Sequence, residues 1–209
     1  EEFSGREFMS ELYHYTVLFT STDLNISPVQ MLNKPATLTM GTGSLMALSG
    51  QKVVPGVVTH FKRIGGSRDQ AKYQITLEPF LSLLRNQFRT HRFFVNKSVA
   101  DVVEEVLRDH GLKEWEYHFV LKADYPVREQ INQYRESDLA FIERLLSEVG
   151  IFYFFTLHPE TQTEVVNFGD KQSAWQFDKI LPLSSPSGEN DNGVSSVWGI
   201  DVRHNVIER

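Results

Sequence analysis

Four acidic residues close together in the sequence could supply a pair of catalytic carboxylic acids. They are Glu136, Asp138, Glu143 and Glu148. Two such groups held near a substrate can act as general acid and general base. At helical spacing, however, Arg144 lies one turn before Glu148 and can form an ion pair with it. The spacing therefore favours a salt-bridged helix surface over paired catalytic acids.

Other residues with suggestive chemistry lack the spacing that the chemistry requires. The pair Gly41 and Gly43 has no third glycine and no following helix, so it indicates a turn and not a phosphate-binding loop. The chain has no Gly-x-Ser-x-Gly segment for a serine nucleophile. Residues 189–193 have calcium-binding side chains in the wrong register for an EF-hand, which favours a solvated turn. We therefore predict no catalytic, cofactor-binding or metal-binding residue here.

The chain has seven histidines, and histidine is a common metal ligand. They are scattered, without the His-x-x-x-His or His-Glu-x-x-His spacing of zinc sites. The sequence leaves open only a zinc site assembled from residues far apart.

Residues 137–150 are predicted to form an amphipathic helix. Ser137 can accept a hydrogen bond from a free amide of the first turn, and Asp138 suits the positive end of the helix dipole. Gly150 supplies the left-handed conformation that ends many helices. One apolar stripe recurs at helical spacing: Leu139, Phe141, Ile142, Leu145, Leu146 and Val149. The next residues, 151–155, are all β-branched or aromatic, so we expect a strand buried in the core, including Phe154.

A second helix is predicted after Ser98, with Asp101 near the capping-box position and Gly111 at its end. Its apolar stripe is Val99, Val102, Val103, Val106 and Leu107. Most of the remaining chain has strand patterns separated by Gly and Pro turns. The expected strands cover residues 12–20, 36–40, 53–64, 71–78, 115–121, 151–157, 163–168 and 194–207. Residues 23–31 are expected to be a polar connection.

Composition limits the class of protein. The 209 residues include 41% hydrophobic and 23% charged residues, which is typical of a globular protein with a core. The net charge of −6, without a block of Lys or Arg, argues against nucleic acid as main partner. No apolar stretch approaches the roughly 20 residues of a membrane span. With no cysteine, the chain forms neither disulfides nor thiolate metal sites.

The segment from Gln133 to Phe154 resembles the signature segment of the VgrG family, the spike proteins of the bacterial type VI secretion system. The order is Gln-Tyr-Arg-Glu-Ser-Asp, then Phe-Ile-x-Arg-Leu-Leu-x-Glu-x-Gly-Ile-x-Tyr-Phe. We call its residues the signature residues and assign them a structural role: Tyr134, Arg135, Glu136, Ser137, Asp138, Phe141, Arg144, Leu145, Glu148, Gly150, Ile151, Tyr153 and Phe154.

Two further segments are similar to the same family. Residues 3–17 match its opening motif, with Met9 where Leu is usual. Residues 55–58 match its short Gly-x-Val strand, although Pro55 replaces the commoner His or Arg. The neck and the β-helical needle of the family have no counterpart here, so we expect a fragment whose second barrel continues past Arg209.

The resemblance implies a mainly β fold with two helices (α+β), built from two small antiparallel β-barrel domains of the phage baseplate-hub type. The implied parts are residues 1–90, the first barrel; residues 91–129, a helix-containing connection; and residues 130–209, an incomplete second barrel. The two barrels are expected to superpose as variants of one structure.

The implied function is structural. Three copies would form a hub that caps the hexameric Hcp tube and carries the puncturing spike and its effectors. The protein would lie in the bacterial cytoplasm before firing and then be secreted. The resemblance leaves open a phage or prophage baseplate hub. A different class of function is the alternative: an enzyme, such as a cell-wall hydrolase domain fused to a hub. An enzyme needs a compact catalytic site, which the sequence does not supply.

Overall fold

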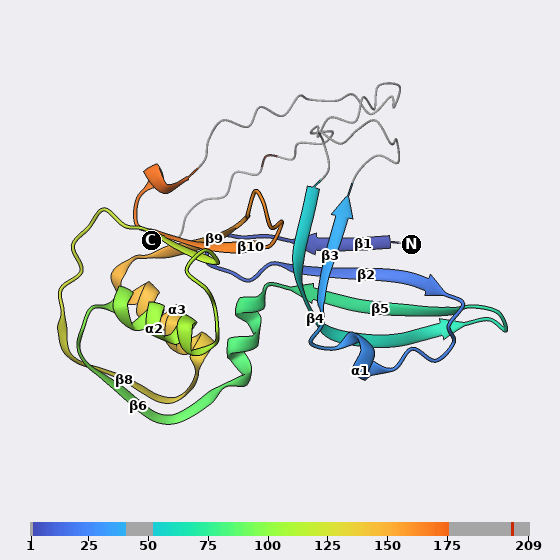
Figure 1. Ribbon diagram of the computed structural model, residues 1–209, viewed down its shortest axis with the longest axis horizontal. Coiled ribbons are helices and arrows are strands. Elements are labelled where there is room, and N and C mark those ends of the chain that lie inside the picture. The colour runs from blue at the N-terminus through green and yellow to red at the C-terminus, as the bar shows by residue number, and fades with distance from the viewer. Residues whose placement is uncertain (1, 41–51, 176–201, 203–209) are drawn as a thin grey trace. The chain divides into compact units, whose positions relative to one another are not determined.

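The computed structural model describes residues 2–40, 52–175 and 202 (Figure 1). The chain divides into two units, of which the first comprises residues 1–38 and 54–174. That unit holds almost all of the described secondary structure. The strands expected at 194–207 and the turns at 41–44 and 189–193 lie outside the described residues.

A five-stranded sheet occupies the first part of the chain and forms a half-barrel, with strand order β1-β2-β5-β4-β3. β2 pairs antiparallel with both β1 and β5, and β5 pairs antiparallel with β4. These strands agree with the sequence prediction within a few residues, apart from β1, which was not predicted. Their bounds are β1 (Glu2–Arg6), β2 (His14–Ser21), β3 (Pro35–Met40), β4 (Lys52–Gly66) and β5 (Ala71–Glu78).

The close approach of two strands explains why the Pro-Gly-Val-Val segment needs a glycine at position 56. A Cβ atom built on Gly56 would lie 2.4 Å from the backbone oxygen of Glu78 on the neighbouring strand. Backbone cannot move aside as the tip of a flexible side chain can. The close approach of β4 to β5 therefore depends on the missing side chain.

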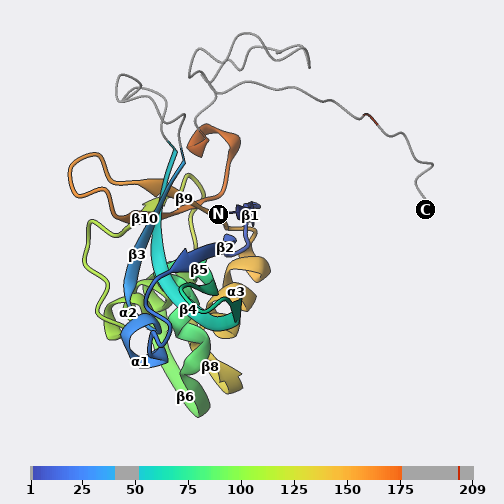
Figure 2. The ribbon, with the colours of Figure 1, turned by 90° about the vertical axis from the view of Figure 1, so that its right-hand side faces the viewer.

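Two helices pack together beside a two-stranded ribbon in the second part of the chain. They are α2 (Val99–Asp109) and α3 (Asp138–Val149), as predicted. Ser98 and Asp101 form the expected capping box, and every residue of the α2 stripe is buried. The ribbon consists of β6 (Phe88–Lys97) and β8 (Arg128–Ser137), paired antiparallel with His91 opposite Tyr134. Figures 1 and 2 show the two strands side by side next to the helices.

A continuous core joins these elements. The inner side of the ribbon contributes Phe94 and Ile131, and the helices contribute their apolar stripes. The 3₁₀-helix η1 (Phe80–Asn86) adds Leu81 and Leu84. The core therefore forms between segments that lie far apart in the sequence.

The third sheet has the order β7-β10-β9. Its strands are β7 (Tyr117–Val120), β9 (Phe152–Leu157) and β10 (Glu164–Gly169). We expected antiparallel pairing throughout, but β10 pairs parallel with β7. A parallel pair needs a long connection, and here β8, α3 and β9 lie between the two strands.

The prediction that residues 151–155 are core throughout is wrong for part of the strand. Ile151 and Tyr153 are buried, whereas Phe152 and Phe154 are only half-buried and stack on each other with ring centroids 6.4 Å apart. A strand alternates its side chains between two faces, and this one has a single fully covered face. The aromatic run concealed that alternation.

Besides the 3₁₀-helix η1, two shorter helical segments were not predicted. Residues 23–31, expected to be a plain connection, contain the single-turn helix α1 (Pro28–Met31), capped by Ser27 and Gln30. The 3₁₀-turn η2 (Gln172–Ala174) follows β10. Among the described residues, no helix combines the length and apolar character needed to cross a membrane.

A buried tyrosine ties the first sheet to the third. The hydroxyl oxygen of Tyr13 lies 2.5 Å from the carbonyl oxygen of Pro55 and 2.6 Å from Oε2 of Glu164. The other oxygen of Glu164 accepts the amide of Phe80 at 2.7 Å. One hydroxyl hydrogen cannot serve two acceptors at once. A protonated Glu164 can donate to Tyr13, which is then free to donate to Pro55.

Burial of the Glu164 carboxyl group raises its pKa to about 7, against the lowering effect of the hydrogen bonds from Tyr13 and Phe80. The folded state therefore binds a proton that the unfolded state has released above about pH 4.5. The free energy of unfolding should consequently fall as the pH rises from about 5 to about 7. Over this window the loss of unfolding free energy through Glu164 is about 2 kcal/mol, at ~1.4 kcal/mol per pKa unit.

This contribution can be isolated with Glu164→Gln, which keeps the shape and the hydrogen-bonding groups without titrating. Denaturant unfolding of wild type and variant should be compared at pH 5, 6, 7 and 8. We expect the wild type to lose stability relative to the variant between pH 5 and 7. A difference in unfolding free energy between wild type and variant that stays constant from pH 5 to 7 would contradict the raised pKa of Glu164.

Candidate functional site: the signature segment

The signature residues follow one another through the end of β8, the whole of α3 and the start of β9. Ser137 caps α3 as predicted, with the amide of Ala140 donating to its Oγ at 3.2 Å. Gly150 ends the helix at φ +72°, and the amide of Ile151 donates to the carbonyl of Leu146 at 2.9 Å. A residue with a Cβ would be strained at this φ. The local signals in the sequence thus position the whole segment.

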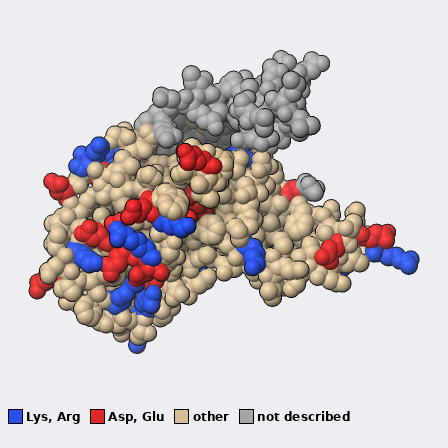
Figure 3. All heavy atoms as spheres, in the orientation of Figure 1, with Lys and Arg blue, Asp and Glu red and all other residues tan. Residues whose placement is uncertain are grey.

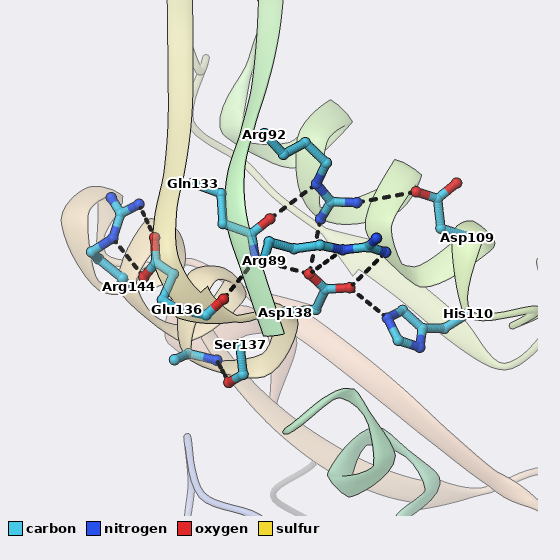
Figure 4. A network of polar contacts seen from close by, with 10 residues as sticks. Arg89, Arg92, Asp109, His110, Gln133, Glu136, Ser137, Asp138 and Arg144 are labelled. Carbon is cyan, nitrogen blue, oxygen red and sulfur yellow. Dashed lines mark hydrogen bonds and ion pairs between the residues drawn. The ribbon is translucent and has the colours of Figure 1, made fainter. Parts of the chain in front are cut away.

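Asp138 is buried, although we expected it at the surface. We predicted a first-turn acid on a salt-bridged surface, but its side chain is completely buried. Oδ1 accepts from Nε2 of Gln133 at 2.8 Å, and Oδ2 lies 2.8 Å from Nε2 of His110. Arg92 approaches Oδ1 at 3.2 Å, and Arg89 approaches both oxygens at 3.4 Å. Figure 4 shows this carboxylate surrounded by the four donors.

The partners of Asp138 are themselves held in place. Arg92 donates to Oε1 of Gln133 at 2.9 Å and to Oδ2 of Asp109 at 3.2 Å. Its guanidinium carbon also lies 5.0 Å from the centre of the Phe94 ring. The network therefore connects β6, β8 and the C-terminal end of α2 to the first residue of α3.

Electrostatics favour the ionised form of this carboxyl group. Burial acts to raise the pKa of Asp138, but the hydrogen bonds of Gln133 and His110 and the positive charges of Arg92 and Arg89 outweigh it. The pKa of Asp138 consequently lies below its ordinary value. A buried carboxylate held in this way is a structural anion.

A second cluster lies on the outer side of α3. Arg144 donates two bonds to Glu136, at 2.7 and 3.2 Å, and one to Glu148 at 2.7 Å. Arg128 reaches the other oxygen of Glu148 at 2.7 Å. The predicted Arg144–Glu148 pair is confirmed, and Glu136 joins it. Hydrogen bonding from Arg128, with support from Arg144, lowers the pKa of Glu148.

The apolar signature residues serve the core. Phe141 and Leu145 are fully buried, and Phe141 stacks on Phe94 with ring centroids 5.8 Å apart. Tyr153 is buried as well and donates to Glu143 at 2.8 Å. Each of the four acids considered as a possible catalytic pair is thus bonded to a structural partner.

Tyr134 and Arg135 are exposed, as are Arg144, Glu148 and Gly150, but they do not belong to the ion-pair cluster that Arg144 and Glu148 form. The Tyr134 ring is 59% exposed, and the Arg135 guanidinium carbon lies 5.3 Å from its centre. Arg135 has φ +49°, an unusual conformation for a residue with a side chain. These two residues have no role in the core.

The geometry offers little for catalysis. The Asp138–His110 contact resembles the pair that orients histidine in a hydrolase triad. A triad would also need a hydroxyl or thiol beside the histidine, whereas here the aspartate is shared with two guanidinium groups. Within residues 2–40, 52–175 and 202 no cluster of three or more His, Asp or Glu is suited to hold a metal ion. The contacts of Asp138 instead fix α3 to α2 and to the β6–β8 ribbon.

Sequence reasoning missed the partners of Asp138: Arg89, Arg92 and His110. Arg89 and Arg92 lie on a strand for which no pattern was identified. Gln133 was recognised as part of the segment, but its burial gave no sequence signal. Only the resemblance to the VgrG signature segment, which includes both Gln133 and Asp138, indicated that these residues matter.

Comparison with protein families places the chain. The family model for the phage tail baseplate hub (GPD) matches residues 6–207. The chain belongs to this baseplate hub family. Two spike proteins of the Pseudomonas aeruginosa type VI secretion system, VgrG4b and VgrG5, are 32% and 33% identical to it over 174 residues. The resemblance to VgrG proteins drawn from the signature residues is therefore confirmed.

These matches cover 83% of this chain but only 20% and 21% of the two relatives. The hub chain thus spans about a fifth of their length. A solved structure from E. coli, a type VI secretion component described as similar to the T4 tail proteins gp27 and gp5, superposes with a TM-score of 0.79. It is 35% identical, and the match covers 98% of this chain and 52% of that one. The fold is therefore mainly β with a few helices, of the gp27/gp5-like type.

Proposed function

We propose that this hub chain is the trimeric base of a type VI secretion spike, which caps a hexameric Hcp tube and connects it to the puncturing spike and its effectors. The observation that carries the proposal is the match of nearly the whole chain to the E. coli secretion component. The site supports it, because the acids of the signature bind structural partners.

The symmetry of the proposed trimer explains how it could bind a hexameric tube. Each copy would supply two similar barrels, residues 1–90 and 130–209, joined by residues 91–129. Three copies would then present six barrels to a six-fold ring, so that a three-fold object can cap a six-fold one. The half-barrel sheet is consistent with the first of these barrels.

The same fold serves phage baseplates, which is the alternative. Identity favours the secretion system: the spike relatives and the E. coli component are 32–35% identical, whereas a Neisseria meningitidis tail protein with TM-score 0.51 is 13% identical. The protein would accordingly lie in the bacterial cytoplasm before firing and be secreted afterwards.

An attached enzyme does not require an enzymatic hub. The actin cross-linking toxin VgrG1 of Vibrio cholerae is 31% identical over 158 residues, and these form 14% of that toxin. We propose that residues 1–209 act by assembly alone. Surface charge agrees, because Figure 3 shows acidic and basic side chains intermixed over the region of α2 and α3, with no one-sign patch on that face.

The proposal is tested by measuring the molar mass of the chain by light scattering and its activity on peptidoglycan. We expect the mass of three chains and no cleavage of peptidoglycan. A monomer that cleaves peptidoglycan, with activity lost in a folded Glu143→Gln variant, would instead establish the hydrolase alternative.

A further inference from the structure

The end of the β4–β5 hairpin carries a local excess of positive charge. We call residues 62–72 the basic tip; they include Lys62, Arg63, Arg68 and Lys72 but a single acid, Asp69. All five of these residues are exposed. The tip has a net charge of +3, whereas the rest of the chain, with 17 basic and 26 acidic residues, has a net charge of −9. The hairpin thus gathers bases that form no single block in the sequence, and their sign is opposite to that of the rest of the chain.

The four bases of the tip form no ion pair with any residue in 2–40, 52–175 or 202. By contrast, arginines elsewhere in these ranges lie within 3.4 Å of a carboxylate oxygen: Arg85, Arg89, Arg92, Arg108, Arg128 and Arg144. Asp23, in the loop that follows β2, accepts the amide of Asn25 at 2.9 Å. Acidic groups serve solubility at least as well as basic ones, so solubility does not explain an unpaired group of bases on an acidic chain.

The fold holds the tip in a defined shape. Tyr73 of β5 is buried and stacks with Phe19 of β2 and Phe61 of β4, with ring centroids 5.6 and 5.4 Å apart. In the turn, the amide of Ser67 donates to the carbonyl oxygen of Gln70 at 2.7 Å. A shape that packing has already fixed loses little conformational freedom when a partner binds.

The bases lie on both sides of the tip, beside one exposed apolar residue. By the strand register, Lys62 and Lys72 share one side of the hairpin, and Arg63 lies on the other. Ile64, at the register shift that follows Arg63, is 37% exposed. Figure 1 shows this end of the hairpin at the right-hand side of the first sheet.

We propose that the basic tip binds an acidic surface of another protein. An apolar side chain within a charged rim is the usual composition of a protein interface, and arginine is enriched in such interfaces. Carboxylates on the partner would pair with the four bases and speed the encounter. This inference goes beyond the proposed function and does not depend on the formation of a trimer.

Nucleic acid is the other polymer that exposed bases bind, and the tip suits it less well. Four bases supply fewer contacts than the about 6–10 phosphates that a strongly salt-dependent DNA-binding protein neutralises. Ile64 has no part in binding phosphates, whereas a protein surface can offer it an apolar counterpart. The mixed character of the tip therefore favours a protein partner.

Two charge-reversed variants of equal net charge test the proposal. Lys62→Glu with Lys72→Glu, the tip variant, changes the charge of the tip from +3 to −1. Lys34→Glu with Lys122→Glu, the control variant, reverses two exposed lysines outside the tip. Both variants have a net charge of −10. The probe is a fluorescently labelled random copolymer of glutamate and tyrosine. Binding is measured by fluorescence anisotropy over a salt series, with circular dichroism to confirm folding.

We expect the tip variant to bind the copolymer at least about tenfold more weakly than the control variant does. Binding by the wild type should weaken as salt is added, because the charges of the tip are exposed. Ile64→Ser tests the apolar contact separately. It should abolish the preference of the wild type for the copolymer over poly-L-glutamate of the same length, and it should leave binding to poly-L-glutamate unchanged.

Each other outcome has a definite meaning. Equal binding of the copolymer by the tip and control variants would contradict the proposal, as would a wild type that does not bind it. Tighter binding to single-stranded DNA or phosphatidylglycerol vesicles than to the copolymer, lost in the tip variant, would assign the tip to phosphate groups instead. A lower molar mass of the tip variant alone in light scattering would identify the acidic partner as a second copy of the chain. A monomeric wild type that binds the copolymer through the tip would contradict only the trimer of the proposed function.

Discussion

Replacing Asp138 by asparagine is expected to lower the free energy of unfolding by about 3 kcal/mol, the range found when one partner of a buried ion pair is removed. Asparagine preserves the shape of the side chain but leaves Arg92, Arg89 and His110 without the anion that they surround. The measurement is denaturant unfolding at pH 7. The change should appear as a lower midpoint with an unchanged slope.

The control is Asp109→Asn on the rim of the same network. The Asp109 side chain is 51% exposed and forms a single contact with Arg92 at 3.2 Å. Exposed pairs contribute about 0–1 kcal/mol, so this variant should remain close to the wild type. If Asp138→Asn proves no more destabilising than Asp109→Asn, the buried network does not hold the elements together.

Acid should have a related effect on the wild type. Since the pKa of Asp138 is lowered by folding, its ionised form stabilises the protein above the ordinary aspartate range. That contribution is lost as the pH falls through the lowered pKa. Asp138→Asn should therefore lose less stability than the wild type on acidification.

Replacing Phe141 by alanine is expected to have a comparable or larger effect, about 3–5 kcal/mol. The ring is fully buried, stacks on Phe94 and lies 5.4 Å below the Arg144 guanidinium carbon. Its loss leaves a cavity between α3 and the ribbon that rigid strands cannot fill.

The matched control comes from the same signature. Tyr134→Ala removes an aromatic ring that is 59% exposed, so it should change the free energy of unfolding of the monomer by no more than about 0.5 kcal/mol. The measurement is thermal and denaturant unfolding of both variants at concentrations where the chain is a monomer. It compares the stability lost with a core ring to the stability lost with a surface ring. Similar losses in the two variants would contradict the division of the signature into core and surface residues.

The helices could be predicted because their signals are local. Ser137, the stripe from Leu139 to Val149 and Gly150 lie within 14 consecutive residues, and cap, stripe and end agree with one another. The same holds for Ser98, Asp101 and the α2 valines. The strands of the first sheet were found from short apolar runs bounded by Gly and Pro.

The buried network could not be predicted in the same way. Asp138 is bound by arginines 46 and 49 residues earlier in the chain, and no periodic pattern connects such positions. An aspartate after a serine cap has an adequate local explanation in the helix dipole, so nothing suggested burial. The aromatic residues 151–155 misled for a related reason: side-chain type predicted a strand but could not reveal which face is covered.

Whether three copies of this chain cap a six-fold tube can be seen by electron microscopy of the chain mixed with its cognate hexameric tube protein. We expect density at the tube ends, with three chains for each terminal ring of six. Chains that remain unbound, attach along the sides of tubes, or sit at the ends in a ratio other than three to six would contradict it.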